Sequence, residues 1–389
     1  MIWFVHPLNS EAVTYVVQRT ELLVALFFLL TLYCTIRGWY TAAVASCLVG
    51  MGSKEVMAGA PMAVLLYDRT FLSGSFSSAL RARRRLYLGL AATWLVLAAL
   101  VATGPRSESV GFDLRVTAWD YLKTQSTVIV HYLRLSVWPE PLVVDYFDWP
   151  LATRLLDALP AALLVCALLA LTVWGVYRRS WTGVLGAWFF LILAPTSSVI
   201  PIVTELAAER RMYLPLIAVI TPIMVAGHRA SRTITPLLTC AIVLVFTVMT
   251  ALRNTDYRSE IAIWSDAVEK RPTNARAHNN LATAWLREGN AEEATRHLTE
   301  AIRLQPRYAQ AYNNLGWTYH VLGRHHDAIR ELETALNLDP TLTQSRYHLA
   351  TAYLALGDRP SALQHESMLR PLDPRLAEVL RKKIADAEC

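Results

Sequence analysis

Two charged residues at a break between apolar segments could hold an anionic ligand. Lys54 and Glu55 follow Gly52 and Ser53, and apolar runs lie on both sides of this tetrapeptide. An ammonium group forms charge-assisted hydrogen bonds with a phosphate, and a neighbouring carboxylate can orient it. The alternative is a pair of charged side chains that reach the membrane interface and only anchor helix ends. We expect phosphate binding by Lys54 and Glu55.

A second charged cluster consists of Glu209, Arg210 and Arg211 and precedes another apolar run. Two adjacent guanidinium groups suit a phosphate or diphosphate, because each can donate two parallel hydrogen bonds to its oxygens. The alternative is an ion pair of these arginines with Glu205 or Glu209. We expect the cluster to contribute to the same phosphate site as Lys54.

Two further groups could take part in catalysis or in sugar binding. His6 and Glu11 are close enough in sequence to form a proton relay, although a single histidine is more often a structural hydrogen-bonding group. The segment 145–149 places two carboxylates beside a tyrosine and a tryptophan, which suits sugar hydroxyls against an aromatic face. The alternative is that these carboxylates are only solvated.

Amide and aromatic side chains recur in the C-terminal third of the chain. One amide side chain can donate to a peptide backbone and accept from it at the same time. A row of such amides would therefore hold an extended polypeptide, unless the amides only satisfy backbone groups between repeats. The expected groove residues are Asn279, Asn280, Asn313, Asn314, Trp317, His320 and Tyr347.

These amides belong to a period of 34 residues. The period is carried by Pro272, Pro306, Pro340 and Pro374, by Leu281, Leu315 and Leu349, by Gly289, Gly323 and Gly357, and by Ala294, Ala328 and Ala362. It is the period of the tetratricopeptide (TPR) repeat, a pair of helices that buries its apolar face only by stacking on neighbours. We expect an α-solenoid whose first helices line a concave groove.

The rest of the chain requires a bilayer. With 54% hydrophobic and 17% charged residues, the sequence could not solvate an ordinary soluble surface. The basic excess lies in residues 1–253, with 20 Lys and Arg against 13 Asp and Glu, so a basic groove for nucleic acid on the repeats is excluded. The five cysteines have no spacing typical of a disulfide framework or a metal site.

Apolar runs predict a polytopic all-α membrane domain of about eight spans. The predicted spans are 22–36, 39–51, 56–67, 86–103, 159–177, 181–203, 212–227 and 233–252. Basic residues cluster in the loops 81–85, 178–179 and 228–232, which predicts that these loops are cytoplasmic. Segments 6–19, 53–55, 104–157, 204–211 and everything after 253 are then outside, with 121–138 as a re-entrant or interfacial helix. The spans lack the buried charges of an ion-coupled transporter.

The polar segments also resemble a known family. The run from His6 to Val13, the pair Gln18-Arg19, the triplet 53–55 and the stretch 208–215 are similar to those of the transmembrane and tetratricopeptide-repeat proteins, which include O-mannosyltransferases of the GT-C superfamily. The segment from Tyr132 to Tyr146 resembles that family's outer loop. The resemblance extends over nearly the whole chain.

The resemblance implies a transferase that moves a sugar from a polyprenyl-phosphate donor to a protein hydroxyl. The donor phosphate site would comprise Arg19, Lys54, Glu55, Glu209, Arg210 and Arg211. No metal or cofactor other than the lipid-linked sugar is implied. Similar enzymes carry an acidic residue in the first outer loop, and that region would lie before Met1. The chain is therefore expected to be an N-terminally truncated enzyme or a non-catalytic relative that acts as a membrane-anchored TPR scaffold.

These expectations give one organisation for the chain. A GT-C-like membrane domain occupies 1–253 and the TPR array occupies 254–374, with a partial repeat at 260–272. Full repeats are expected at 275–308, 309–342 and 343–374, followed by a capping helix at 375–389. The expected partners are the bilayer, the lipid-linked sugar and a polypeptide on the concave face. The expected location is a bacterial inner membrane with periplasmic repeats, or the endoplasmic reticulum with lumenal repeats in a eukaryote.

Overall fold

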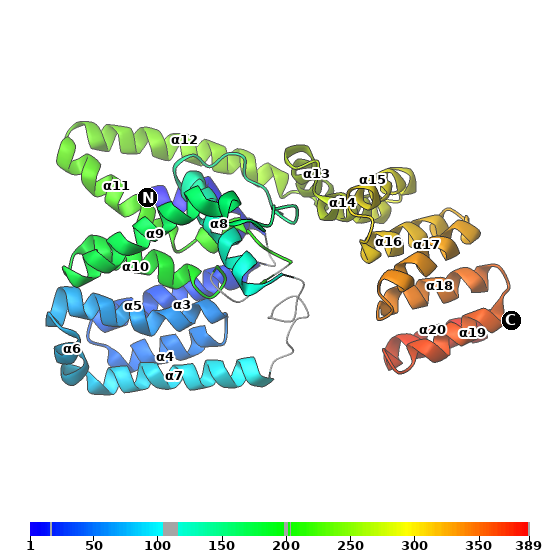
Figure 1. Ribbon diagram of the computed structural model, residues 1–389, viewed down its shortest axis with the longest axis horizontal. Coiled ribbons are helices and arrows are strands. Elements are labelled where there is room, and N and C mark those ends of the chain that lie inside the picture. The colour runs from blue at the N-terminus through cyan, green and yellow to red at the C-terminus, as the bar shows by residue number, and fades with distance from the viewer. Residues whose placement is uncertain (16–17, 104–115, 198–200, 203, 388–389) are drawn as a thin grey trace. The chain divides into compact units, whose positions relative to one another are not determined.

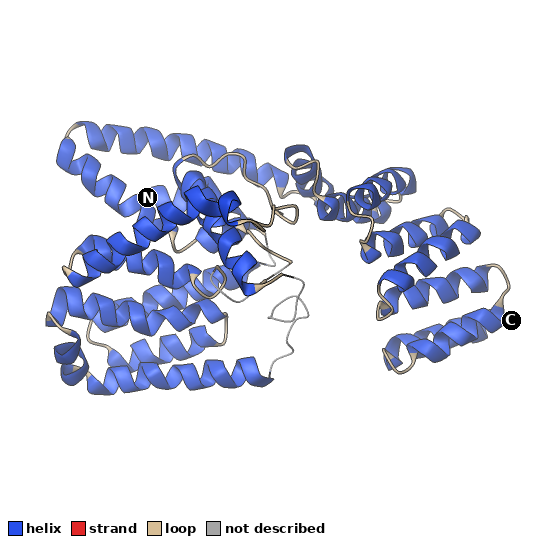
Figure 2. Cartoon of the chain, in the orientation of Figure 1, coloured by secondary structure: helices blue, strands red, loops and turns tan. Residues whose placement is uncertain are grey.

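The computed structural model describes residues 1–15, 18–103, 116–197, 201–202 and 204–387. The described residues form helices and loops without a strand (Figure 2), so the all-α prediction is confirmed. The chain divides into two compact units, unit 1 (Met1–Tyr257) and unit 2 (Arg258–Cys389). Parts of the predicted span 181–203 and of the predicted outer loop 104–157 lie outside the described residues.

Unit 1 consists of long apolar helices joined by short helical segments (Figure 1). In chain order these are α1 (Ile2–Val5), η1 (Pro7–Asn9), α2 (Ser10–Thr14), α3 (Arg19–Ile36), α4 (Tyr40–Met51), η3 (Glu55–Gly59), α5 (Ala60–Tyr67), η4 (Asp68–Ser73), α6 (Phe76–Ala82), α7 (Arg84–Thr103), α8 (Ala118–Val137), α9 (Leu155–Tyr177), α10 (Trp181–Leu193), η5 (Glu209–Met212), α11 (Leu216–Ala230) and α12 (Ile234–Asp256).

Four described helices of unit 1 are long and apolar enough to cross a membrane, namely α3, α7, α9 and α12. The shorter apolar helices α4, α10 and α11 have 12, 13 and 15 residues. At the rise of an α-helix they reach about 18–23 Å, less than the roughly 30 Å of a hydrocarbon core. The predicted run 56–67 is divided between η3 and α5, because Pro61 occupies the first turn of α5. The prediction of about eight spans is therefore not confirmed.

The basic loops and the polar segments lie at opposite ends of unit 1. Arg179 Nη1 donates to the carbonyl of Gly74 at 2.8 Å, which joins the α9–α10 turn to the loop before α6. The α11–α12 turn lies at the same end, here called the basic end (Figure 1). At the other end, the polar end, Thr14 Oγ1 donates to Asn254 Oδ1 at 2.9 Å, close to the end of α12.

Helix α8 covers most of the predicted segment 121–138 and packs its polar residues into unit 1. Tyr121 and Tyr132 are fully buried in this helix. Lys123 is also buried, and its Nζ donates to the carbonyl of Thr153 at 2.5 Å and pairs with Asp120 at 2.8 Å. The charges of this helix are thus satisfied within the protein.

Unit 2 is a series of antiparallel helix pairs with the 34-residue spacing. Its helices are α13 (Glu260–Lys270), α14 (Ala275–Arg287), α15 (Ala291–Leu304), α16 (Ala309–Val321), α17 (His325–Leu338), α18 (Thr343–Ala355), α19 (Arg359–Leu369) and α20 (Pro374–Asp386). Gly289, Gly323 and Gly357 follow α14, α16 and α18 with φ of 80°, 74° and 78°, the left-handed conformation that ends a helix. Helix α20 buries Ala377, Leu380 and Ile384, so it covers the apolar face of the last pair.

Candidate functional site

Four asparagine side chains form a continuous hydrogen-bonded row across two repeats of unit 2. Asn279 Nδ2 donates to Asn280 Oδ1 at 3.2 Å, and Asn313 Nδ2 donates to Asn314 Oδ1 at 3.0 Å. Asn314 Nδ2 donates to Asn279 Oδ1 at 2.8 Å and so joins the two pairs. Asn279 and Asn313 are buried, whereas Asn280 and Asn314 are half-buried. Asn279, Asn313 and Asn314 connect neighbouring helices, and Asn280 and Asn314 remain partly exposed.

The row continues into the third repeat through side chains of α18. Ser345 Oγ donates to Asn313 Oδ1 at 2.9 Å, and His348 Nδ1 lies 3.1 Å from the same oxygen. Burial lowers the pKa of His348 to about 4, so its ring is neutral near pH 7 and its Nδ1–H is the donor. Asn313 therefore acts as a junction between α16 and α18.

Trp317 stacks with two histidine rings. Its ring centroid is 4.5 Å from that of His348 and 5.1 Å from that of His320, with interplanar angles of 25° and 22°. This double stack fixes the indole orientation on α16. Tyr347 also contacts His348, with ring centroids 5.9 Å apart, and the Lys383 ammonium of α20 lies over the Tyr347 ring at 5.8 Å.

A pocket of about 270 Å³ opens beside Trp317, between α14 and α16. It is smaller than the roughly 300–1,000 Å³ typical of small-molecule sites, and its size suits one apolar side chain. The lining residues are Ala282, Thr283, Leu286, Arg287, Leu298, Asn314, Trp317 and Thr318. We call this the TPR pocket. Two of the predicted groove residues, Asn314 and Trp317, thus contribute to one concave site.

The predicted arginines of unit 1 are buried and paired with carboxylates or carbonyls. The Arg210 guanidinium donates to Glu11 Oε1 at 2.6 Å, and the Arg210 backbone N–H donates to Glu11 Oε2 at 3.0 Å. Its second Nη forms an ion pair with Glu205. These two carboxylates hold the pKa of Arg210 above its ordinary value despite burial. The Glu205 pairing is one of the alternatives considered from sequence, and Glu11 is an additional partner.

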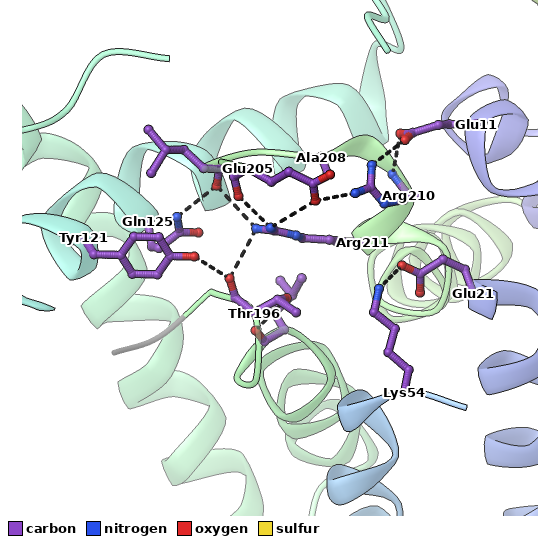
Figure 3. Close-up of polar contacts among 12 residues, drawn as sticks. Glu11, Glu21, Lys54, Tyr121, Gln125, Thr196, Glu205, Ala208, Arg210 and Arg211 are labelled. Carbon is purple, nitrogen blue, oxygen red and sulfur yellow. Dashed lines mark hydrogen bonds and ion pairs between the residues drawn. The ribbon is translucent and has the colours of Figure 1, made fainter. Parts of the chain in front are cut away.

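Arg211 binds backbone carbonyls of the loop before η5, as Figure 3 shows. Its guanidinium donates to the carbonyls of Thr196, Leu206 and Glu205 at 3.2, 3.3 and 2.6 Å. Two α8 side chains bind the same stretch of loop: Tyr121 Oη donates to Thr196 O at 2.7 Å, and Gln125 Nε2 donates to Leu206 O at 2.9 Å. Arg211 therefore fixes this loop against α8.

Lys54 meets the arginines at a narrow pocket. It forms an ion pair with Glu21 of α3 (Figure 3). Lys54, Glu21, Arg210 and Arg211 all line this pocket, whose volume of about 10 Å³ is about what one water requires. With Glu11 and Glu205 included, three cations face three carboxylates, so the cluster carries no excess positive charge for an anion.

The remaining predicted phosphate ligands lie outside this pocket. Glu55 and Arg19 are exposed, at the starts of η3 and α3 respectively. Glu209 is buried, and its Oε1 accepts from the Val143 N–H at 2.5 Å and from Tyr146 Oη at 2.6 Å. Burial raises the pKa of Glu209 to about 8, so near neutral pH this carboxyl is mostly protonated. The structure thus separates the predicted set into a paired cluster, two exposed residues and one buried acid.

His6 and Glu11 bind different partners. His6 Nδ1 accepts from the Leu8 N–H at 3.2 Å, so Nε2 carries the proton and donates to Ser136 O at 3.1 Å. Burial lowers the pKa of His6 to about 4 and keeps the ring neutral. Glu11 faces Arg210 instead, and no hydrogen bond among the described residues joins it to His6. This geometry gives His6 a structural role in the segment before α2.

The segment 145–149, proposed from sequence for sugar hydroxyls, is folded against α8. Tyr146 and Asp145 are buried, and Asp148 and Trp149 are half-buried. Trp149 Nε1 donates to Thr127 Oγ1 at 3.2 Å. The Tyr146 hydroxyl faces Glu209, so this ring supports the η5 segment.

The sequence did not predict two of the pairings that neutralise the basic residues, Lys54 with Glu21 and Arg210 with Glu11. Glu21 lies in the first turn of α3, where a carboxylate also interacts favourably with the helix dipole, and this position was a usable signal.

Within the described residues no group of three or more His, Cys, Asp or Glu could hold a metal ion.

Comparisons with known proteins match the C-terminal unit. Family models described as tetratricopeptide repeat match residues 248–295, 273–341 and 343–365, so the repeats of unit 2 are tetratricopeptide repeats. No curated protein matches the chain.

Solved structures of TPR proteins are also similar to part of the chain. A thermophilic TPR protein of Thermus thermophilus is 23% identical, with 44% of this chain and 89% of that chain covered and a TM-score of 0.30. YrrB, a TPR protein with an unusual peptide-binding site, is 16% identical over 44% of this chain and 89% of its own, with a TM-score of 0.31. The TPR domain of Arabidopsis OM64 is 20% identical over 29% of this chain and 94% of its own, with a TM-score of 0.28.

Proposed function

Because unit 2 is an array of tetratricopeptide repeats, we propose that this protein binds an extended polypeptide on that array and holds it at a membrane. The observation that carries the proposal is the TPR pocket, where the half-buried Asn314 amide adjoins the fixed Trp317 ring. The Asn314 amide would exchange its long 3.4 Å hydrogen bond to Thr283 Oγ1 for one to the peptide backbone, and the pocket would take one apolar side chain of the ligand. Backbone recognition with a single anchoring pocket predicts broad sequence tolerance.

A peptide-binding measurement tests this proposal. Detergent-solubilised full-length protein is incubated with an array of overlapping peptides, and dissociation constants are measured for those that bind. Trp317→Ala removes one wall of the pocket and is expected to weaken binding by about tenfold or more, as for a central aromatic contact. Arg330→Ala, an exposed residue of α17, is the matched control. Equal affinities for the two variants would refute the proposed site.

The membrane placement of unit 1 is part of the same proposal. Four apolar helices support it, and the separation of basic and polar ends supports an orientation with the basic end in the cytoplasm. Helix α12 ends beside Thr14 at the polar end, so the chain would leave the membrane on the non-cytoplasmic side. Alkaline phosphatase fused after Cys389 should be active, and a fluorescent protein that needs the cytoplasm should be dark. The reverse pattern would contradict this orientation.

A second candidate function is glycosyl transfer from a polyprenyl-phosphate sugar to a protein hydroxyl, with the repeats docking the acceptor. One observation favours it: Lys54 lines the same pocket at the polar end as Arg210 and Arg211, which are distant from it in sequence. In that case a donor phosphate would have to replace the Glu21 carboxylate at Lys54, because the cations are already paired. This requirement places the enzyme second to the membrane-anchored binding protein.

The two candidates separate in one assay. Full-length protein is incubated with polyprenyl-phosphate mannose and the peptides that bind the array, and transfer of the sugar is followed by mass spectrometry. Transfer that is lost in Lys54→Gln, with peptide binding unchanged, would support the transferase. Peptide binding without transfer would leave the scaffold as the function.

A further inference from the structure

A groove separates α11 from the first half of α12 at the basic end. The two helices meet near their turn, where a Cβ on Gly227 would lie 3.4 Å from the Thr235 side chain. The second half of α12 packs elsewhere, since Thr250 Oγ1 donates to Val5 O at 2.8 Å and the Phe246 ring contacts His6. The groove has a volume of about 550 Å³ and is lined by Met224, Val225, His228, Arg229, Thr235, Pro236, Thr239 and Cys240.

The floor of this groove is apolar. Two of its lining residues are threonines, and the hydroxyl of Thr239 donates to Thr235 O at 2.8 Å and is satisfied within α12. No residue in the most apolar stretch of α12 is buried within unit 1. In a bilayer such a surface is covered by lipid chains, because neither water nor another described helix fills it.

The mouth of the groove is basic. His228 and Arg229 line it, Arg232 follows in the turn, and all three are exposed. Among the described contacts none of them forms a hydrogen bond or an ion pair. The chain has no Asp or Glu between Met212 and Arg253. Arg83, at the same end, does have a partner, because its Nη1 forms an ion pair with the buried Asp68 at 2.8 Å.

We propose that the α11–α12 groove binds one anionic phospholipid of the leaflet at the basic end. Its phosphate lies at Arg229, with His228 and Arg232 nearby, and one acyl chain follows the groove floor past Thr239. Basic pockets between membrane helices on the cytoplasmic side recognise acidic headgroups in this way. The lipid joins α11 to the half of α12 that the protein itself leaves uncovered. This inference rests on the proposed membrane placement of unit 1 and is independent of what unit 2 binds.

Native mass spectrometry of the full-length protein tests the site. The protein is extracted in detergent and titrated with phosphatidylglycerol or with phosphatidylcholine of the same acyl chains. Soluble glycerol 3-phosphate is titrated separately, so that a headgroup site for free phosphate is distinguished from a lipid site. Arg229→Gln removes the central cation, Thr239→Trp fills the groove, and Arg81→Gln removes an exposed arginine of α6 at the same end as the matched control.

We expect phosphatidylglycerol to bind more tightly than phosphatidylcholine. Arg229→Gln should weaken phosphatidylglycerol about fivefold, the effect of one basic residue near an anionic headgroup, and leave phosphatidylcholine unchanged. Thr239→Trp should weaken both lipids, Arg81→Gln neither, and glycerol 3-phosphate should not bind detectably.

Several results would overturn the inference. Equal affinity for the two lipids, or equal loss in Arg229→Gln and Arg81→Gln, would remove the headgroup site. A lipid-free dimer that depends on Thr239 would show that a second copy covers the groove. Recovery of the protein in the soluble fraction would overturn the inference together with the membrane placement, whereas a failure of peptide binding would leave the lipid site standing.

Discussion

Asn314 donates a hydrogen bond from its Nδ2 to Oδ1 of Asn279, 2.8 Å away, and so links the first helices of two consecutive repeats. The acceptor is buried and the donor is half-buried. These amides bond to side chains rather than to backbone groups between the repeats, and peptide binding stays a prediction. Asn279 and Asn313, the buried inner amides, hold the array together with Asn314, and Asn280 and Asn314, the outer amides, are partly exposed.

The first prediction concerns the inner amides. Asn313→Ala leaves Ser345 and His348 without their shared acceptor, and an unsatisfied buried polar group costs about 1–3 kcal/mol. We expect faster hydrogen exchange in α16 and α18 of the full-length protein, measured by mass spectrometry. Asn280→Ala, at the half-buried end of the row, is the control and should leave exchange in α18 unchanged. Identical exchange in the two variants would show that the row contributes nothing to stability.

The second prediction is a loss of stability of unit 2 in mild acid. His278 Nε2 donates to Pro272 O at 3.2 Å, so its Nδ1 accepts from His297 Nδ1 at 3.1 Å. His297 Nε2 then accepts from the Arg296 guanidinium at 2.8 Å. Burial and next the Arg296 charge lower the pKa of His297 to about 4, and burial lowers the pKa of His278. Protonation of His278 at Nδ1 would place two N–H donors, those of His278 Nδ1 and His297 Nδ1, against each other.

The sign follows from the lowered pKa. The unfolded histidine takes up a proton below about pH 6.5, and the folded one does so only near pH 4. The free energy of unfolding of unit 2 is therefore constant above about pH 6.5 and decreases as the pH is lowered from about 6.5 to about 4. At pH 5 the decrease is about 1–2 kcal/mol. Calorimetry at pH 7.5 and pH 5 measures it. The double variant His278→Leu/His297→Leu should show a flatter pH dependence, and an unchanged slope would assign the acid sensitivity to other groups.

The third prediction concerns the buried ion pair of unit 1. Glu11→Gln leaves the Arg210 guanidinium with Glu205 as its one remaining carboxylate partner among the described residues. Removal of one partner of a buried pair costs about 3–5 kcal/mol, so we expect a strongly lowered Tm in detergent. The double variant Glu11→Gln/Arg210→Gln should cost less than the two single losses combined. Strict additivity would mean that the pair does not interact.

The fourth prediction concerns Glu209. Its pKa of about 8 lies above the ordinary value of 4.5, so the folded state holds the proton more tightly than the unfolded state. The free energy of unfolding of unit 1 should then fall as the pH rises from about 4.5 to about 8, by a total of up to about 5 kcal/mol. Glu209→Gln mimics the protonated acid and should reduce this fall. Thermal unfolding at pH 6 and pH 8.5 measures it, with the exposed Glu140→Gln as control. An equal or steeper fall in Glu209→Gln would contradict the assignment.

The repeats could be predicted from sequence because each position has a local physical cause. Gly289, Gly323 and Gly357 adopt positive φ, and the alanines at helix crossings are fully buried. A period that combines such positions fixes both the helices and their stacking. The same reasoning found two of the residues of the TPR pocket.

The membrane unit could be predicted only in part. Hydropathy marks apolar runs, but Pro61 divides one of them and the short length of α4 is set by Gly52 and Ser53. The sequence does not indicate that Glu11 and Arg210 are partners, because they are 199 residues apart. Sequence spacing carries no information on such a contact, and the charge balance at the polar end became visible only in the fold.

The claim that unit 2 binds a polypeptide beside Trp317 is tested most directly by photo-crosslinking in membranes. A benzophenone amino acid is placed at position 317 and, in a second protein, at position 330 on α17. We predict ultraviolet-dependent adducts with polypeptide from position 317, competed by a peptide that binds the array, and none from position 330. Adducts of equal yield from both positions, or from neither, would contradict a polypeptide-binding groove.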